Sequence, residues 1–270
     1  MKKLLAAMFV TLLVVGCGGD EEPSPAPLNL STSAVEGKPF AIPDLSMEML
    51  WVKPGTFEMG SSSGGSEETP QAVTLTQGFH LGKHEVMQAQ WEKVMGSNPS
   101  SYKGADRPVE TVSWTDVTSF CERLTELERK AGRLPAGMAY QLPTEAQWEY
   151  ACRAGTTTAF SFGDELTAKD ANFDKNVGET TDVGKYPANA WGFHDMHGNV
   201  WEWTADWWGG FPTGAVSDPV GPAVGSGRVL RGGSWNFSAL NARSAYRLGT
   251  GPAGSVINLG FRLSLRPASQ

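Results

Sequence analysis

Apolar residues recur with the spacing of an α-helix in three segments of the chain. The first segment is 86–95, and its apolar face carries Met87, Trp91 and Val94. The second segment follows Ser113, and Asp116 stands three residues later in the arrangement of a capping box. Its apolar stripe consists of Trp114, Val117, Phe120, Cys121, Leu124 and Leu127.

The third helical segment begins after Thr144, and Gln147 stands at the reciprocal position of its capping box. Its apolar face carries Trp148, Ala151 and Cys152. Beyond Gly155 neither a helical nor an alternating period persists up to Arg266. We therefore expect turns and short extended pieces there, held together by the burial of some of the chain's 10 tryptophans.

Short strands are predicted before the first helix. The stretch MLWVKPGTFEMGS, residues 49–61, has apolar pieces broken by Pro-Gly, which indicates a hairpin or two short strands. Alternation of apolar and polar residues then indicates a strand pair that carries Val73, Leu75, Phe79 and Leu81. Few helices and many short strands predict a loop-rich α+β domain.

The N-terminus has the features of a bacterial lipoprotein signal. Lys2 and Lys3 precede an apolar run, 4–15, which is too short to span a bilayer comfortably. The run leads into Val-Val-Gly-Cys, which resembles a lipobox and implies cleavage after residue 16 and lipidation of Cys17. An ordinary signal peptide with an incidental cysteine is the alternative. Gly18 carries no signal for inner-membrane retention, so we expect an outer-membrane anchor in the cell envelope.

Residues 17–46 are predicted to be a lipidated cysteine and a flexible tether, because the stretch is polar, acidic and rich in proline. The folded domain is then expected at 47–266, with a tail at 267–270. The net charge of −7 is spread over interspersed acids and bases. No basic face is available to follow a phosphate backbone, so nucleic acid is not an expected partner.

Seven blocks of sequence occur in an order that resembles one family. They are WVKPGTFEMGS, KHEVMQAQWEKVMG, RPVETVSWTDVTSFC, YQLPTEAQWEYACRAG, HDMHGNVWEWTADWW, RVLRGGSW and NLGFRL. Together they resemble the formylglycine-generating enzymes, also called sulfatase-modifying factor domains, over about residues 47–265. The resemblance implies a single α+β domain of the family's C-type-lectin-like fold, with few helices and short strands.

The resemblance also implies where catalytic cysteines would lie. Active members of the family bind copper through two cysteines between the Gly-Gly-Ser-aromatic block and the Gly-Phe-Arg block. This chain has no cysteine there, and the candidate positions hold Phe237, Ala239 and Ala242. Because Cu(I) requires soft thiolate ligands, copper is not expected and no catalytic residue is assigned. An oxidase that acts on protein cysteine in the same cleft is the alternative.

Two cysteines remain after Cys17. In the copper enzymes the residues that match Cys121 and Cys152 pair with cysteines near the C-terminus. Here Leu263 stands in one partner region, and Ser244 and Ala245 stand in the other. We expect buried free thiols, because both cysteines lie on the apolar face of a helix. A disulfide between the two is the alternative in an oxidising compartment.

Family members bind calcium in loops, and the resemblance carries two such loops over to this chain. In the first, Asp195 and Glu202 would supply carboxylates, and Gly198 and Val200 would supply carbonyl oxygens. The alternative is that Asp195 and Glu202 brace the loop through backbone amides. The second loop would begin with Asn172 and the carbonyl of Phe173, but it lacks a clear aspartate. Calcium is thus expected as a structural ion.

The chain's four histidines are not expected to bind metal. The iron-dependent branch of the family takes its histidines from an extra helical domain, for which this chain has no room. His80 and His84 lie in a strand-turn context, where residues four apart stand about 13 Å from each other. Solvated or core-edge positions are expected for both. His194 and His197 are left out of the calcium shell, because calcium prefers oxygen.

These observations predict a binding or scaffold module anchored to the membrane by lipid, with a protein, peptide or glycan as its ligand. A variable ligand-binding protein of lectin-like fold is an alternative. The expected contact surface consists of Trp235, Asn236, Phe237, Ser238, Asn241, Arg243, Tyr246, Arg247 and Asn258. For Trp235 and the two arginines, a framework role against the core is the alternative.

Overall fold

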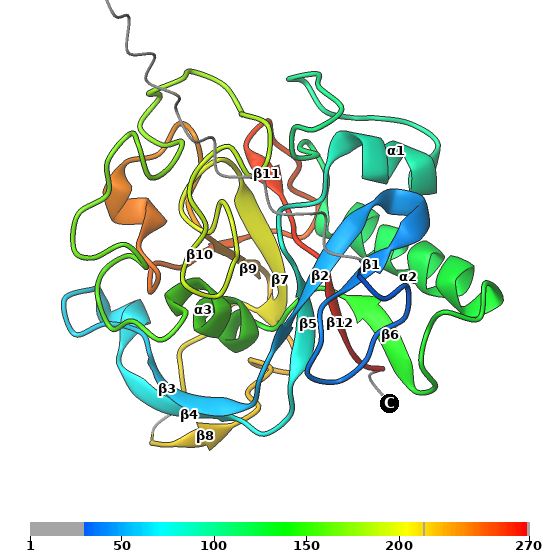
Figure 1. Cartoon of the computed structure of the whole chain (residues 1–270). Helices are drawn as coiled ribbons and strands as arrows, with labels where there is room; N and C mark the ends of the chain where they lie inside the picture. Colours follow the sequence, from blue (N-terminus) through cyan, green and yellow to red (C-terminus); the bar gives the residue numbers. More distant parts are fainter. Residues whose placement is uncertain (1–29, 213, 269–270) are drawn as a thin grey trace, which may run out of the picture.

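The three predicted helices are present in the computed structural model, which describes residues 30–212 and 214–268 (Figure 1). They are α1 (Gln88–Met95), α2 (Trp114–Lys130) and α3 (Glu145–Arg153). Ser113 and Asp116 form the predicted capping box of α2, and Thr144 and Gln147 form that of α3. Helix α1 begins two residues later than predicted, because Met87 still pairs as extended chain with Pro108.

A five-stranded antiparallel sheet brings the two ends of the domain together. Its strands follow the order β1 (Phe40–Ile42), β2 (Met47–Val52), β5 (Phe79–Gly82), β12 (Ser264–Pro267) and β6 (Met138–Gln141). Strand β12 therefore closes the chain against β5, whose sequence lies nearly two hundred residues earlier.

Two smaller sheets complete the fold. One has the order β10 (Leu248–Thr250), β9 (Arg228–Arg231), β7 (Trp201–Trp207) and β11 (Leu259–Gly260). The other consists of β3 (Gly55–Met59), β4 (Gln71–Leu75) and β8 (Val216–Ser217). Short 3-10 turns are η1 (Pro43–Leu45), η2 (Ser66–Glu68) and η3 (Ala239–Ala242).

The strands before α1 exist as predicted, but their pairing differs. Strands β2 and β3 belong to different sheets, so 49–61 forms two separate strands and no hairpin. Strands β4 and β5 are likewise separated, because β4 pairs with β3 and β5 pairs with β2. The predicted inward residues of β4 and β5 are nevertheless buried, since alternation decides which face a residue occupies whatever strand lies beside it.

The folded domain begins earlier than the expected boundary at residue 47. Phe40 and Ile42 of β1 and Leu45 of η1 are buried in the main core, and β1 pairs with β2. The predicted tether thus includes a short core strand, because even three residues with alternating apolar side chains can extend a sheet edge. The expected signal peptide and Cys17 lie outside the described residues.

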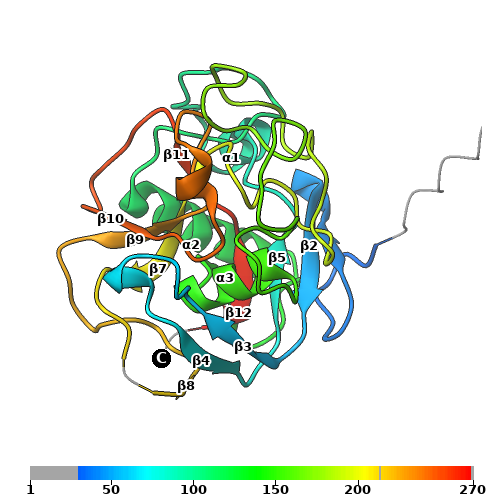
Figure 2. The same cartoon turned by 90° about the vertical axis from the view of Figure 1, so that its left-hand side faces the viewer.

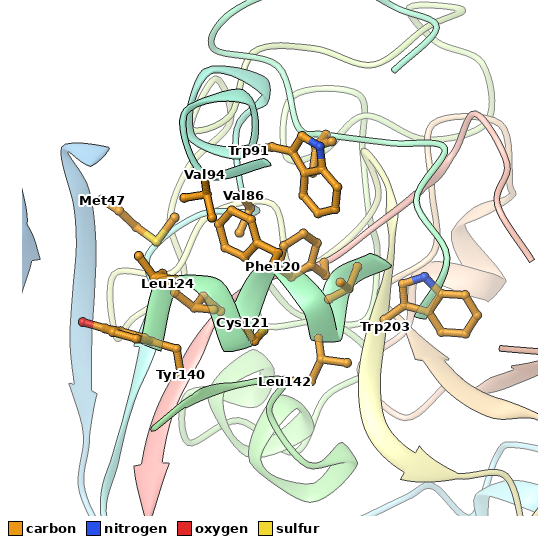
Figure 3. Close-up of a cluster of buried hydrophobic side chains, with 14 of the residues drawn as sticks. Met47, Val86, Trp91, Val94, Phe120, Cys121, Leu124, Tyr140, Leu142 and Trp203 are labelled. Carbon is orange, nitrogen blue, oxygen red and sulfur yellow. The ribbon is translucent and has the colours of Figure 1, made fainter. Parts of the chain in front are cut away.

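The main core lies between α1, α2 and the five-stranded sheet (Figure 3). The rings of Trp91 and Phe120 stack with centroids 5.3 Å apart, and Phe261 meets the Phe120 ring edge-on at 5.4 Å. Cys121 lies in this cluster as a small apolar residue. This packing fixes the two helices against the sheet on which the loop-rich half is built.

Tryptophans hold the loop-rich half together, as expected. Trp203 is fully buried, and its indole N–H donates to the carbonyl of Val112, 3.0 Å away. Trp201 is buried beside it on β7, whereas Trp207 and Trp208 are half-buried. In the described part of the chain, none of the helices has the length and apolar content needed to cross a membrane.

Candidate functional site

Strand β7 and the loop before it carry the motif HDMHGNVWEWTADWW. The Glu202 carboxylate on β7 is buried and faces Arg262, whose guanidinium donates to both carboxylate oxygens at 2.7–3.0 Å. The indole N–H of Trp148 donates to Oε2 at 2.7 Å. Arg262 also donates to the carbonyl of His194 at 2.9 Å. The guanidinium therefore ties β7 to the preceding loop.

Two further acids accompany this ion pair. Asp195 accepts a hydrogen bond from the backbone N–H of Gly184 at 2.6 Å, and burial raises its pKa to about 6. Glu85 is fully buried and accepts hydrogen bonds from Asn199 and from the backbone of Val200. Burial, reinforced by the charge of Asp195, raises the pKa of Glu85 well above its ordinary value. Three buried acids thus surround one guanidinium.

This geometry does not fit calcium with Glu202 as a ligand. Both of its oxygens already accept hydrogen bonds from Arg262, and a divalent ion on the same carboxylate would face a guanidinium at close range. The hydrogen bonds of Glu202 count against calcium at this carboxylate, and its role as a calcium ligand stays a prediction. In the structure, Asp195 braces the loop through a backbone amide, and Glu202 braces it through side chains. Within residues 30–212 and 214–268, three or more His, Cys, Asp or Glu side chains do not gather into a metal-binding group.

The second expected calcium loop presents one open acceptor. Asn172 is buried and donates through its amide nitrogen to the carbonyl of Glu179 at 2.8 Å, while its Oδ1 has no hydrogen-bond partner. The carbonyl of Phe173 accepts from the backbone of Asn176 at 2.9 Å and retains a second lone pair. An unpartnered buried oxygen fits a cation or a water molecule. This loop therefore fits calcium better than the first.

The ring nitrogens of both histidines in the motif contact backbone carbonyls. His197 contacts the carbonyl of Ala242 through Nδ1 at 2.7 Å and accepts from the backbone N–H of Ser161 at Nε2. Burial lowers the pKa of His197 to about 4, so the ring is neutral at physiological pH. His194 contacts the carbonyl of Tyr186 at 2.8 Å. His84 is half-buried, as expected for the edge of the core. His80 differs from the expectation: it is 2% exposed, because its ring packs between those of Phe40 and Trp51.

Cys121 and Cys152 are buried free thiols, as predicted. The Sγ of Cys152 lies 3.6 Å from the hydroxyl of Ser244, so the residue at the expected disulfide-partner position does lie beside this cysteine. Burial raises the pKa of Cys152 to about 12 and raises that of Cys121 as well. Neither cysteine forms a thiolate at neutral pH, and the thiolate is the reactive and metal-binding form.

Both arginines of the expected contact surface are framework residues. The guanidinium of Arg247 forms a two-pronged ion pair with Glu145 at 2.6 and 2.7 Å, and it lies over the rings of Trp208 and Phe211. Arg243 forms the same kind of pair with Glu68, at 2.8 Å for each bond. These contacts support the framework interpretation for both arginines.

Two other residues of that surface are buried in its base. Trp235 meets the ring of Tyr102 edge-on and directs its indole N–H towards the carbonyl of Ile257 at 3.5 Å. Asn258 is buried and donates to Asn236 at 2.8 Å. The other residues of the expected contact surface are half-buried or exposed, namely Asn236, Phe237, Ser238, Asn241 and Tyr246.

An exposed apolar surface surrounds these positions, and sequence reasoning missed most of it. Leu240 is 70% exposed and Val256 is 51% exposed. Backbone hydrogen bonds from Asp174 and Lys175 to the carbonyls of Phe237 and Trp235 bring segment 174–177 beside segment 235–241. We define the C-terminal surface as Val177, Phe237, Leu240, Val256 and Ile257. The sequence signal that could have indicated this surface is the presence of apolar residues within loops rich in Gly, Ser and Asn.

Comparisons with known proteins identify the family of this chain. The family model of the sulfatase-modifying factor enzyme 1-like domain matches residues 38–267. Chaperone protein LppX of Paenibacillus barcinonensis is 30% identical over 247 residues, which cover 75% of this chain and 83% of LppX. The formylglycine-generating enzyme of Mus musculus is 34% identical over 196 residues, which cover 66% of this chain and 49% of the enzyme.

The solved structure of Treponema denticola variable protein 1 matches with a TM-score of 0.75 at 31% identity. That match covers 85% of this chain and 99% of the variable protein. The chain thus spans most of two relatives but only about half of the mouse enzyme. The expected α+β, lectin-like single domain is confirmed. The chain belongs to the sulfatase-modifying factor family.

Proposed function

We propose that this protein is a binding module of the cell envelope that lacks formylglycine-generating activity. The observation that carries the proposal is the absence of cysteine from residues 232–263. Phe237 packs edge-on against Trp201 at 5.4 Å, and Ala242 is buried with its carbonyl bonded to His197. Apolar side chains thus fill the region where thiolate ligands would be needed for Cu(I).

The remaining thiols cannot substitute for the missing pair. Cys121 lies in the core between α1, α2 and the large sheet, and Cys152 lies under Ser244 and His197. Burial raises the pKa of both thiols, so both remain protonated at neutral pH. A protonated and buried thiol neither binds copper nor exchanges with a substrate thiol.

The C-terminal surface supports a protein or peptide as the partner. Its apolar side chains lie on loops that pack against the buried rings of Trp201 and Trp235. Exposed apolar groups on a fixed base favour protein contacts over glycan contacts. The name of LppX, a chaperone protein, agrees with this class of partner. Lipidation at Cys17, with an anchor in the outer membrane, completes the proposal.

Copper titration tests the loss of the catalytic site. We expect no tight Cu(I) binding when the purified chain competes with a Cu(I) indicator, whereas an active formylglycine-generating enzyme removes copper from the indicator under the same conditions. Stoichiometric copper uptake by this chain would overturn the proposal. Mutation of the surviving thiols, Cys121→Ala and Cys152→Ala, would then identify the ligands.

A variable ligand-binding protein is the second candidate. The observation that favours it is the match to Treponema denticola variable protein 1, which covers 99% of that protein. In this candidate, residues 235–258 would differ between copies of the gene. A nearby near-repeat of the coding DNA that differs mainly at adenines supports it. A genome without such a repeat contradicts it.

A further inference from the structure

A cavity of about 400 Å³ has Arg247 in its wall. Its lining residues come from the β3–β4–β8 sheet, from the start of α3 and from 209–212 and 219–222. Figure 2 shows how these strands and α3 are arranged. Its size falls within the range of about 300–1,000 Å³ that is typical of small-molecule pockets. The cavity shares only Arg247 with the contact surface expected from the sequence.

The walls of the cavity are apolar and fixed. They include Met59, Ala146, Phe211, Val216 and Val220. Strand β8 pairs in parallel with β4, and the guanidinium of Arg247 donates to the carbonyl of Gly209 at 2.7 Å. Gly209 and strand β8 are therefore each attached to the body of the domain.

A buried acid in the wall of the cavity lacks the partners that buried charged groups usually have. Asp206 is 4% exposed and accepts one hydrogen bond, from the backbone of Glu145 to Oδ2 at 2.7 Å. Among the described residues, no cation forms an ion pair with Asp206, whereas Arg247 neutralises Glu145. Gln71 also lines the cavity, but its unpartnered Oε1 is buried beneath the cavity surface. One acidic group thus remains to be matched.

We propose that this cavity binds a small hydrophobic amine, with its apolar body against Phe211 and Val216 and its ammonium group towards Asp206. The ammonium supplies a hydrogen-bond donor and a counter-charge to the carboxylate. An anionic ligand would meet the carboxylate without a free cation to receive it. A fully apolar ligand would leave the carboxylate unmatched, which is costly in a buried site.

The titration of Asp206 gives the proposal a pH signature. Burial raises the pKa of Asp206 to about 7, and the charge of Glu145 on α3 adds to the shift. The hydrogen bond from the backbone of Glu145 and the charges of Arg266 on β12 and Arg247 act in the opposite direction. The amine stays protonated over this range and prefers the ionised carboxylate. Its affinity therefore weakens as the pH falls below about 7, by up to tenfold per pH unit.

Calorimetric titration of the full chain in detergent tests this inference. The probes are phenethylammonium, its neutral isostere 2-phenylethanol and the anion 3-phenylpropionate, at pH 8 and pH 6. We expect phenethylammonium to bind at least tenfold more tightly than either other probe at pH 8, and to weaken at pH 6. Asp206→Asn should weaken its binding at least tenfold, whereas Asp106→Asn, an exposed acid outside the cavity, should not change it.

The inference is overturned by any of three results. The first is that phenethylammonium does not bind saturably. The second is that 2-phenylethanol binds as tightly as phenethylammonium. The third is that a folded Asp206→Asn variant binds phenethylammonium as tightly as the wild type does. Circular dichroism checks the fold of each variant. If Asp206→Asn does not fold, the wild type at pH 8 and pH 6 carries the comparison between the amine and the alcohol, and only the amine should lose affinity at pH 6.

Discussion

Replacing Arg262 by methionine tests the network that occupies the expected calcium loop. The guanidinium is fully buried, and it is the ion-pair partner of Glu202. It also bonds the carbonyls of Gly82 and His194, so one change breaks contacts to three chain segments. Removing one partner of a buried ion pair costs about 3–5 kcal/mol, because the other charge stays buried and unpaired.

The free energy of unfolding, measured by urea denaturation with tryptophan fluorescence, gives the size of this effect. We expect Arg262→Met to lower it by about 3–5 kcal/mol. Arg123→Met, on the exposed face of α2, is the matched control and should change it by less than about 0.5 kcal/mol. The double variant Arg262→Met/Glu202→Met should recover part of the loss, because the Glu202 carboxylate no longer remains buried without its ion-pair partner. A loss below about 1 kcal/mol for Arg262→Met would refute the reasoning.

Three further predictions concern the loops and the buried thiol. Ser244→Cys should form a disulfide with Cys152 under oxidising conditions and raise the free energy of unfolding by about 2–4 kcal/mol. Apart from Cys17, the oxidised and unfolded variant should then show one titratable thiol, that of Cys121, and three such thiols would contradict the prediction. Because burial raises the pKa of Asp195 to about 6, its stabilising contribution is complete below about pH 4 and is lost as the pH rises through 6. Urea midpoints at pH 4–7 should therefore depend less on pH in Asp195→Asn than in the wild type, and equal slopes would rule this out. Calcium at 100 times its Kd should raise the free energy of unfolding of the wild type by about 2.7 kcal/mol and should not change that of Asn172→Ala. An equal response of both proteins in thermal melts would count against calcium binding at the Asn172 loop.

The helices were predictable because their signals are local. Each capping box lies within one helical turn, as Ser113 with Asp116 and Thr144 with Gln147 show. A short window of sequence therefore contains the complete capping box. The same holds for the burial of alternating residues in β4 and β5. Strand partners were not predictable, because β12 joins β5 across nearly the whole domain and no local pattern encodes that pairing.

The contacts of Glu202 were not predictable for the same reason. A short motif shows which oxygens are available, but the cation that satisfies them lies 60 residues away at Arg262. The start of the domain was missed for a related reason, since β1 is three residues long and lies among polar and proline residues. The two surface arginines were assigned by residue type, whereas their partners Glu68 and Glu145 lie more than a hundred residues earlier.

The most direct test of the central claim is turnover of a sulfatase-motif peptide. The purified chain is incubated with copper, a thiol reductant and oxygen, and mass spectrometry measures conversion of the peptide cysteine to formylglycine. We predict no conversion above that of a reaction without protein, because residues 232–263 contain no thiol and the other cysteines are buried. Catalytic conversion that persists after metal-free purification and copper loading would contradict the assignment as a binding module.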